Sequence, residues 1–93
     1  MSNTIDIIRK LGYDKNKKET EIESKQVEKK SIQERIDDID SERDLFTDEV
    51  RHQRAKAVDK KRHLEREIVE LRSVVRDFDV EINTLTLQLE YGA

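Results

Sequence analysis

The apolar residues in the second half of this chain recur at helical spacing. From position 64 onward, successive members lie four and three residues apart without a break, at Leu64, Ile68, Leu71, Val75, Phe78, Ile82, Leu85 and Leu89. This spacing keeps all of them on one face of an α-helix and is typical of a coiled-coil seam. Residues 64–89 are therefore predicted to form the main interface through which the chain oligomerises.

The first half of the chain carries a weaker version of the same pattern. A heptad frame that starts at Ile22 adds these apolar residues to the predicted interface: Ile32, Ile36, Ile39, Phe46 and Val50. Other seam positions of this frame are polar, namely Lys25, Lys29, Arg43, Gln53 and Lys60. Leu64 takes different heptad positions in the two frames. One unbroken helix would therefore need a stutter, a local change of supercoil, after Ala57.

A separate short helix is predicted at the amino terminus. One apolar stripe at helical spacing consists of Ile5, Ile8 and Leu11. Gly12 follows it directly, and glycine commonly ends helices. We therefore divide the chain into a two-turn amphipathic helix within residues 1–13 and a coiled-coil rod or hairpin over residues 14–93. Two turns alone are unstable, so the stripe is expected to dock, either onto the rest of the chain or into a groove of a partner protein.

The remainder of the chain has few helix breakers. Proline is absent, and the two glycines are Gly12 and Gly92. A single helix over most of this length would extend for about 110 Å. Some apolar residues lie off the seam, which indicates contact with more than one other helix: Val69, Val74, Val80 and Leu87. Residues 85–91 also alternate between apolar and polar, so a short carboxy-terminal strand is an alternative to helix there.

Charged residues come in two blocks of opposite sign. Residues 34–49 are mainly acidic and residues 51–62 are mainly basic. Folding the chain about residue 50 would pair the two blocks and bring Ile36 near Leu64, either in an intramolecular hairpin or in an antiparallel dimer. The turn of such a hairpin, Thr47–Gln53, lacks the Gly, Pro and Asn that favour reversal. Its first three residues nevertheless resemble a helix start. The sequence leaves the choice between hairpin, antiparallel and parallel arrangements open.

Composition favours an all-α, elongated coiled coil over a compact globule. Of the 93 residues, 33% are hydrophobic, 44% are charged and 4% are aromatic, which is too little apolar surface for a wide core. Cysteine is absent, and this excludes disulfides and thiolate metal sites. No apolar run approaches the roughly 18–20 residues of a membrane span, and no signal-peptide pattern opens the chain. We therefore expect no membrane contact and a cytoplasmic location, in a cell or an infected host.

The sequence offers little for catalysis or ligand chemistry. His52 and His63 lie too far apart along a helix to share a metal ion, which needs ligands three or four residues apart. The basic block Arg51–Arg62 has no interleaved aromatic residue for base stacking, so nucleic acid is not an expected partner. A glycine-rich phosphate loop and a cysteine nucleophile are both absent. We expect no catalytic residue, no cofactor and no metal site.

Protein partners are the remaining class. We hypothesise a structural protein that self-associates, as a dimer or trimer, and attaches through its amino-terminal stripe to a larger protein assembly. Its small size and helical architecture suggest, by analogy alone, a virion component or viral assembly factor. The alternative hypothesis is a small regulator or inhibitor whose apolar carboxy-terminal face occupies a site on another protein.

Overall fold

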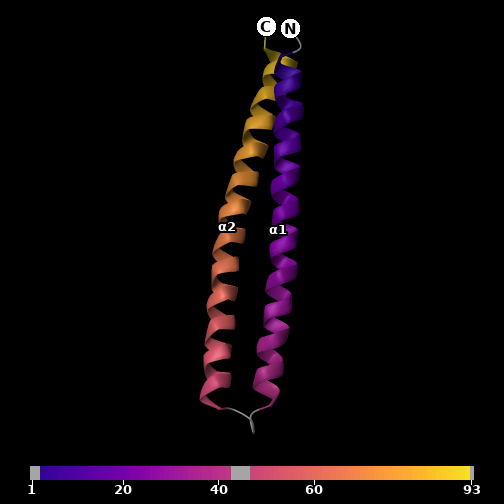
Figure 1. Ribbon diagram of the computed structural model, residues 1–93. Helices are drawn as coiled ribbons and strands as arrows, with labels where there is room; N and C mark the ends of the chain where they lie inside the picture. The colour runs from indigo at the N-terminus through magenta and orange to yellow at the C-terminus, as the bar shows by residue number, and fades with distance from the viewer. Residues whose placement is uncertain (1–2, 43–46, 93) are drawn as a thin grey trace. The chain divides into compact units, whose positions relative to one another are not determined.

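The residues that the structure describes form two α-helices. A computed structural model describes residues 3–42 and 47–92, in which α1 spans Asn3–Ser41 and α2 spans Asp48–Tyr91 (Figure 1). The predicted all-α class is therefore confirmed for these residues. The alternative of a strand over residues 85–91 is wrong, because α2 continues to Tyr91. There the helical spacing that runs through Ile82, Leu85 and Leu89 outweighs the local period of two.

α1 passes through Gly12 without interruption, so the predicted helix end at this residue is wrong. A terminating glycine adopts a positive φ, and no glycine in the described residues does so. A glycine inside a helix costs about 1 kcal/mol relative to alanine. The half-buried series that faces α2 continues across Gly12, from Ile8 and Leu11 to Lys15 and Lys18. Packing along this series outweighs the cost of the glycine.

α2 begins where the sequence suggested a helix start. The hydroxyl of Thr47 accepts a hydrogen bond from the Val50 amide at 3.3 Å, and its carbonyl accepts one from the Arg51 amide at 3.0 Å. Asp48 and Glu49 follow in the first turn, where their charges suit the helix dipole. At the other end, the Gly92 amide donates to the Gln88 carbonyl at 2.8 Å and closes the last turn.

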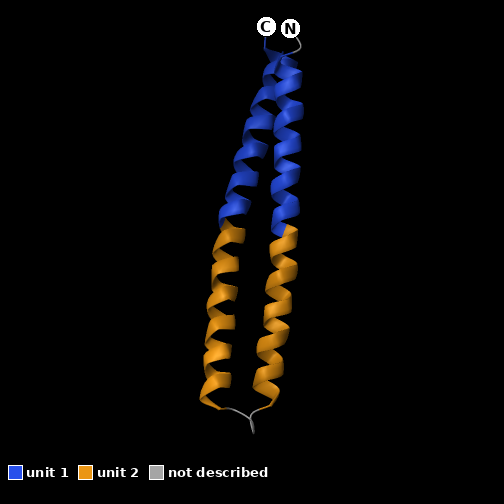
Figure 2. Ribbon diagram, viewed as in Figure 1, with its two compact units in different colours: residues 1–22, 70–93 blue, residues 23–69 orange. Residues whose placement is uncertain are grey.

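The chain divides into two compact units, each built from one segment of α1 and one of α2 (Figure 2). Unit 1 comprises Met1–Ile22 and Glu70–Ala93, and unit 2 comprises Glu23–Val69. The two helix segments of each unit run in opposite directions (Figure 2). Unit 2 is thus an intramolecular helical hairpin, one of the arrangements that the sequence left open.

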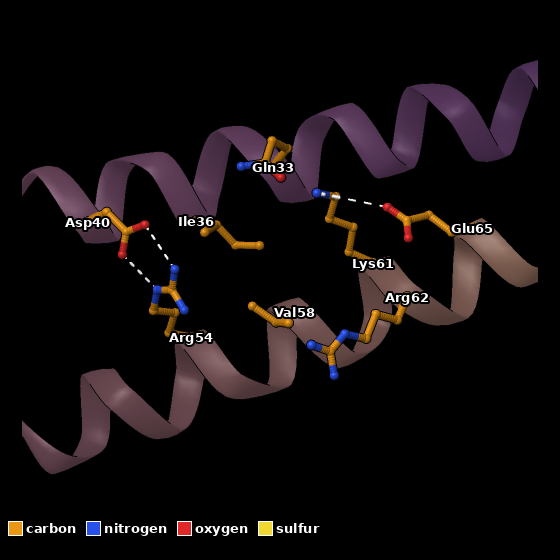
Figure 3. A pocket seen from close by; sticks show the side chains of 8 residues that line it. All are labelled: Gln33, Ile36, Asp40, Arg54, Val58, Lys61, Arg62 and Glu65. Atoms are coloured by element: carbon orange, nitrogen blue, oxygen red, sulfur yellow. Dashed lines mark hydrogen bonds and ion pairs between the residues drawn. The ribbon is translucent and has the colours of Figure 1, made fainter.

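The register of the hairpin differs from the one that the charge blocks suggested. Asp40 of α1 forms an ion pair with Arg54 of α2, and Ile36 points toward Val58 (Figure 3). The expected proximity of Ile36 to Leu64 is therefore wrong. The reversal lies between the end of α1 at Ser41 and the start of α2 at Asp48, earlier than the predicted turn about residue 50.

The seam of α2 follows one heptad frame along the whole helix, so the predicted stutter is absent. The series that contains Leu64 continues backward through half-buried Lys61, Ala57, Arg54 and Val50. Gln53 and Lys60, which the first frame placed in the seam, are exposed. The two frames belong to two helices, and a chain reversal between helices removes any need for a common frame.

The inward-facing series of α1 has the same four-and-three spacing but is interrupted by cations. Its buried or half-buried members are Ile8, Leu11, Lys15, Lys18, Ile22, Lys25, Lys29, Ile32, Ile36 and Ile39. Among the described residues, the buried apolar side chains are Ile36, Leu64 and Ile68, with 4–5% of their surface exposed. All three belong to unit 2.

Candidate interaction surfaces

The residues predicted to form the oligomer interface lie mostly on the facing sides of α1 and α2. Leu64, Ile68 and Ile36 are buried, whereas Leu89 is 46% exposed. The other described members are half-buried: Ile32, Ile39, Val50, Leu71, Val75, Phe78, Ile82 and Leu85. Phe46 lies outside the described residues. The seam thus serves contact within the chain, and its contact with a second copy stays a prediction.

Lysine side chains cover the buried part of the seam in unit 2. The Lys25 ammonium donates a hydrogen bond of 2.6 Å to Glu67, the residue before Ile68. Lys29 pairs with Glu65, the residue after Leu64, at 3.7 Å. These ion pairs join the two helices beside two of the buried residues. A lysine held in this way can lay its aliphatic stem over a neighbouring apolar side chain while its charged end stays in solvent. The hydrogen bond from Lys25 lowers the pKa of Glu67 below its ordinary value.

In unit 1, an ion pair between a lysine and a carboxylate also joins the two helices. Lys15 of α1 pairs with Asp79 of α2 at 2.6 Å, and this hydrogen bond raises the pKa of Lys15 above its ordinary value. Lys18 pairs with Glu21 of its own helix at 3.6 Å.

Lys25 and Lys29 are polar positions of the predicted seam, and in the structure they pair with carboxylates of α2. In the sequence, a carboxylate stands next to the apolar residue of α2 near each of these lysines, and this signal could have revealed the ion pairs.

A mixed-charge groove lies between the helices of unit 2. It has a volume of about 350 Å³, and Ile36 and Val58 point into it from the two helices (Figure 3). At one end, Arg54 donates two hydrogen bonds to the carboxylate of Asp40, at 2.6 and 3.0 Å. This bidentate contact raises the pKa of Arg54 and fixes the register of the hairpin. Both signs of charge line the groove, so it favours neither anions nor cations.

A second groove in unit 2 carries charges of one sign. Its volume is about 220 Å³, and its lining consists of Ile32, Arg35, Gln53, Lys56, Ala57 and Lys60. We call it the cationic groove, because three of these side chains are cations and none is a carboxylate. Ile32 and Ala57 supply its apolar surface. Lys60 also reaches Glu28 of α1 at 3.2 Å.

Most of the exposed large apolar side chains belong to unit 1. On its α1 segment they are Ile5, Ile7 and Tyr13, with exposures of 45%, 47% and 62%. The predicted docking stripe is thereby split, since Ile8 and Leu11 are half-buried in the series that faces α2 while Ile5 remains exposed.

The α2 segment of unit 1 carries a second apolar face. Val80, Leu87 and Tyr91 are 60%, 55% and 80% exposed. With Thr84 they are spaced four, three and four residues apart, on the side of α2 away from its seam. We call this set the outer stripe. Residues 77–91 around it contain no lysine or arginine, and their charged residues are Asp77, Asp79, Glu81 and Glu90.

The part of the chain that the structure describes contains no candidate metal site and no candidate membrane span. Within residues 3–42 and 47–92, no group of three or more His, Cys, Asp or Glu could hold a metal ion. Over the same ranges, neither helix is long and apolar enough to cross a membrane. No protein-family model, curated protein or solved structure matches this chain.

Proposed function

We propose that this protein is a non-catalytic assembly component that self-associates as a coiled coil and attaches to a larger protein assembly. The observation that carries the proposal is the incomplete cover of the α2 seam. In unit 1, the seam residues from Leu71 to Leu85 are only half-buried against α1, and Leu89 is exposed.

The two helices of unit 1 leave their seam partly open to solvent. A side chain in a two-helix contact meets neighbours on one side and solvent on the other, whereas a third or fourth helix closes the remaining side. Burying apolar area contributes about 25 cal/mol per Å². A second copy that covers the half-buried residues of unit 1 therefore adds stability that the single chain lacks.

The attachment role falls to exposed residues near the start of α1. Ile5 and Ile7 are 45% and 47% exposed. Because they lie two residues apart on α1, they flank the residues that face α2 on opposite sides, where a partner can contact either of them without disturbing that pairing. The adjacent Ile8 belongs to the pairing with α2. We therefore place the docking contact at Ile5 and Ile7 and assign Ile8 and Leu11 to unit 1 itself.

The solution mass of the full chain tests self-association. Light scattering after size exclusion is expected to give a mass two or three times the 11.1 kDa of one chain. Leu85→Asp should reduce the mass to that of a monomer, because it places a charge in the partly covered seam. Asn83→Asp is the matched control, since Asn83 is exposed and lies off the seam.

A monomer at all concentrations would contradict self-association. In that case the exposed outer stripe would favour the second function, a regulator that binds another protein through the apolar carboxy-terminal part of α2. Capture of a partner by the wild type and by Leu89→Asp, but not by Leu87→Asp, would support that function.

A further inference from the structure

The outer stripe and the cationic groove are surfaces that the pairing of α1 with α2 leaves open. The stripe belongs to unit 1 and presents Val80 and Leu87 on a stretch of α2 without cations. The groove belongs to unit 2 and presents Ile32 and Ala57 among side chains that include no carboxylate. Each surface has an apolar part, and their charges are opposite.

We propose that the outer stripe of one copy lies in the cationic groove of a second copy, so that chains join head to tail. The inference rests on the self-association proposed above and adds a second contact, between two surfaces that lie away from the seam. The occupant of the groove is thus a second copy of this chain.

The apolar parts suit a helix packed into a groove between two others. Side chains spaced four and three residues apart, as in the outer stripe, form the ridge that such packing requires. Ala57 is small and Ile32 is only half-buried, so the groove has room for Val80 or Leu87. Burying these two side chains, which are 60% and 55% exposed, removes apolar surface on either side of the stripe's polar Thr84.

Charge selects the groove over other partners of the stripe. Asp77, Glu81 and Glu90 border the stripe, while Asp79 is already paired with Lys15. The groove offers Arg35 and Lys56, while Lys60 is already paired with Glu28. Opposite charges at the rim of an interface steer association and fix orientation.

The same charges disfavour pairing of the stripe with itself. Two copies of residues 77–91 would bring together carboxylates from both chains with no lysine or arginine in either segment. Each like-charge pair on a helix surface costs a few tenths of a kcal/mol. A stripe-to-stripe dimer would therefore be weaker than the contact with the groove.

A contact between two different surfaces leaves one copy of each surface free at the ends of every complex. Association of this kind continues until a ring closes or a chain of copies grows. It follows that the mass should rise with protein concentration, and that added salt should reduce it by screening the charges at the rim.

Two variants, each of which disables one surface, test the proposal. The groove variant carries Arg35→Glu and Lys56→Glu, and the stripe variant carries Val80→Glu and Leu87→Glu. All four positions are on helices, where glutamate is well tolerated, and circular dichroism checks that helicity is kept. Each variant alone is expected to fall to the mass that the seam contact gives by itself, whereas an equimolar mixture should regain contacts between groove and stripe, because one functional groove then meets one functional stripe.

Other results would overturn the proposal. If the groove variant keeps the wild-type mass and the stripe variant does not, the stripe pairs with itself. If both keep the wild-type mass, neither surface takes part, and self-association proceeds through the seam alone. A monomeric wild type would instead remove the proposed self-association itself.

Matched controls separate these effects from general changes in charge. Lys30→Glu reverses a cation of unit 2 outside the cationic groove. Val27→Glu introduces a carboxylate at an apolar residue that is 70% exposed and lies outside the groove. Both are expected to keep the wild-type mass, and a loss of mass in either would show that the charge of unit 2 as a whole, and not the groove, drives association.

Discussion

Unit 2 and unit 1 differ in how well their apolar residues are covered, and the unit with the more apolar α2 segment has the poorer cover. Ile36, Leu64 and Ile68 are buried in unit 2, although the α2 seam there includes Arg54 and Lys61. From Leu71 to Leu89 the seam of α2 is entirely apolar. Even so, none of the described residues of unit 1 is fully buried.

We interpret this difference as an effect of side-chain length and of ion pairs between the helices, in addition to apolar content. A branched aliphatic side chain on one helix is too short to shield its neighbour on the other from solvent. A lysine stem is long enough, provided that an ion pair holds its end in place. In unit 2, Lys25 and Lys29 pair with Glu67 and Glu65, the neighbours of Ile68 and Leu64.

The largest expected effect contrasts two leucines at equivalent seam positions of α2. Leu64→Ala in unit 2 should lower the free energy of unfolding by about 2–3 kcal/mol, because Leu64 is 5% exposed and its removal leaves a cavity. Leu71→Ala in unit 1 should cost about 1 kcal/mol, since Leu71 is half-buried. Urea unfolding followed by circular dichroism, at a concentration where the chain is monomeric, measures both. Equal losses would mean that the two units cover their leucines equally.

A second, smaller effect separates the stem of Lys25 from its charge. Lys25→Ala removes both the aliphatic cover of Ile68 and the hydrogen bond to Glu67, and it should cost about 1 kcal/mol. Lys25→Met keeps most of the stem and should cost only a few tenths of a kcal/mol, as expected for loss of an exposed ion pair. The same urea titration distinguishes them. If Met is as damaging as Ala, the charge and not the stem stabilises unit 2.

Much of the fold could be predicted from the spacing of apolar residues. The regular series from Leu64 to Leu89 gave both the helix and its inward face, because four-and-three spacing has one geometric solution. The chain reversal was harder to predict, since no Gly or Pro marks it between Ser41 and Asp48. Its sequence signal was the change of heptad frame itself, which we interpreted as a stutter within one helix.

The candidate surfaces were less predictable than the helices. The off-seam position of Val80 and Leu87 was visible in the sequence, and both are exposed. The cationic groove was not predicted, because it forms only when the hairpin brings Arg35 of α1 and Lys56 of α2 to the lining of one groove. Which residues share a groove depends on the register of the hairpin, and the charge blocks suggested a different register from the one observed.

A third effect concerns unit 1 alone. Gly12→Ala should raise stability by about 0.5–1 kcal/mol, because Gly12 lies inside α1 and an added Cβ would meet no atom within 4 Å. Hydrogen exchange should show the gain in slower exchange of amides near residue 12. Gly92→Ala is the contrasting variant, since its Cβ would meet the carbonyl oxygen of Gln88, and no gain is expected. Unchanged exchange in Gly12→Ala would indicate that packing, and not helix propensity, sets the stability of α1 near residue 12.

The smallest expected effect is a difference in pH response between the units. The pKa of Glu67 in unit 2 is lowered by its hydrogen bond from Lys25. Its contribution to stability is therefore present above the ordinary pKa of a glutamate and is lost as the pH falls through the lowered value. The pKa of Lys15 in unit 1 is raised by its hydrogen bond to Asp79, so its contribution is present at neutral pH and is lost as the pH rises through the raised value.

Two variants, each of which removes one charge, test whether these ion pairs cause the loss of stability in acid and in alkali. Glu67→Gln should reduce the loss of stability between neutral pH and strong acid, and Lys15→Met should reduce the loss in strong alkali. Both changes should be small and should shrink further in salt, because the pairs are exposed. Urea midpoints across the pH range, with and without salt, provide the measurement. If Glu67→Gln leaves the acid limb unchanged, the clamp over Ile68 does not depend on the charge of Glu67, and the stem of Lys25 is held by packing alone.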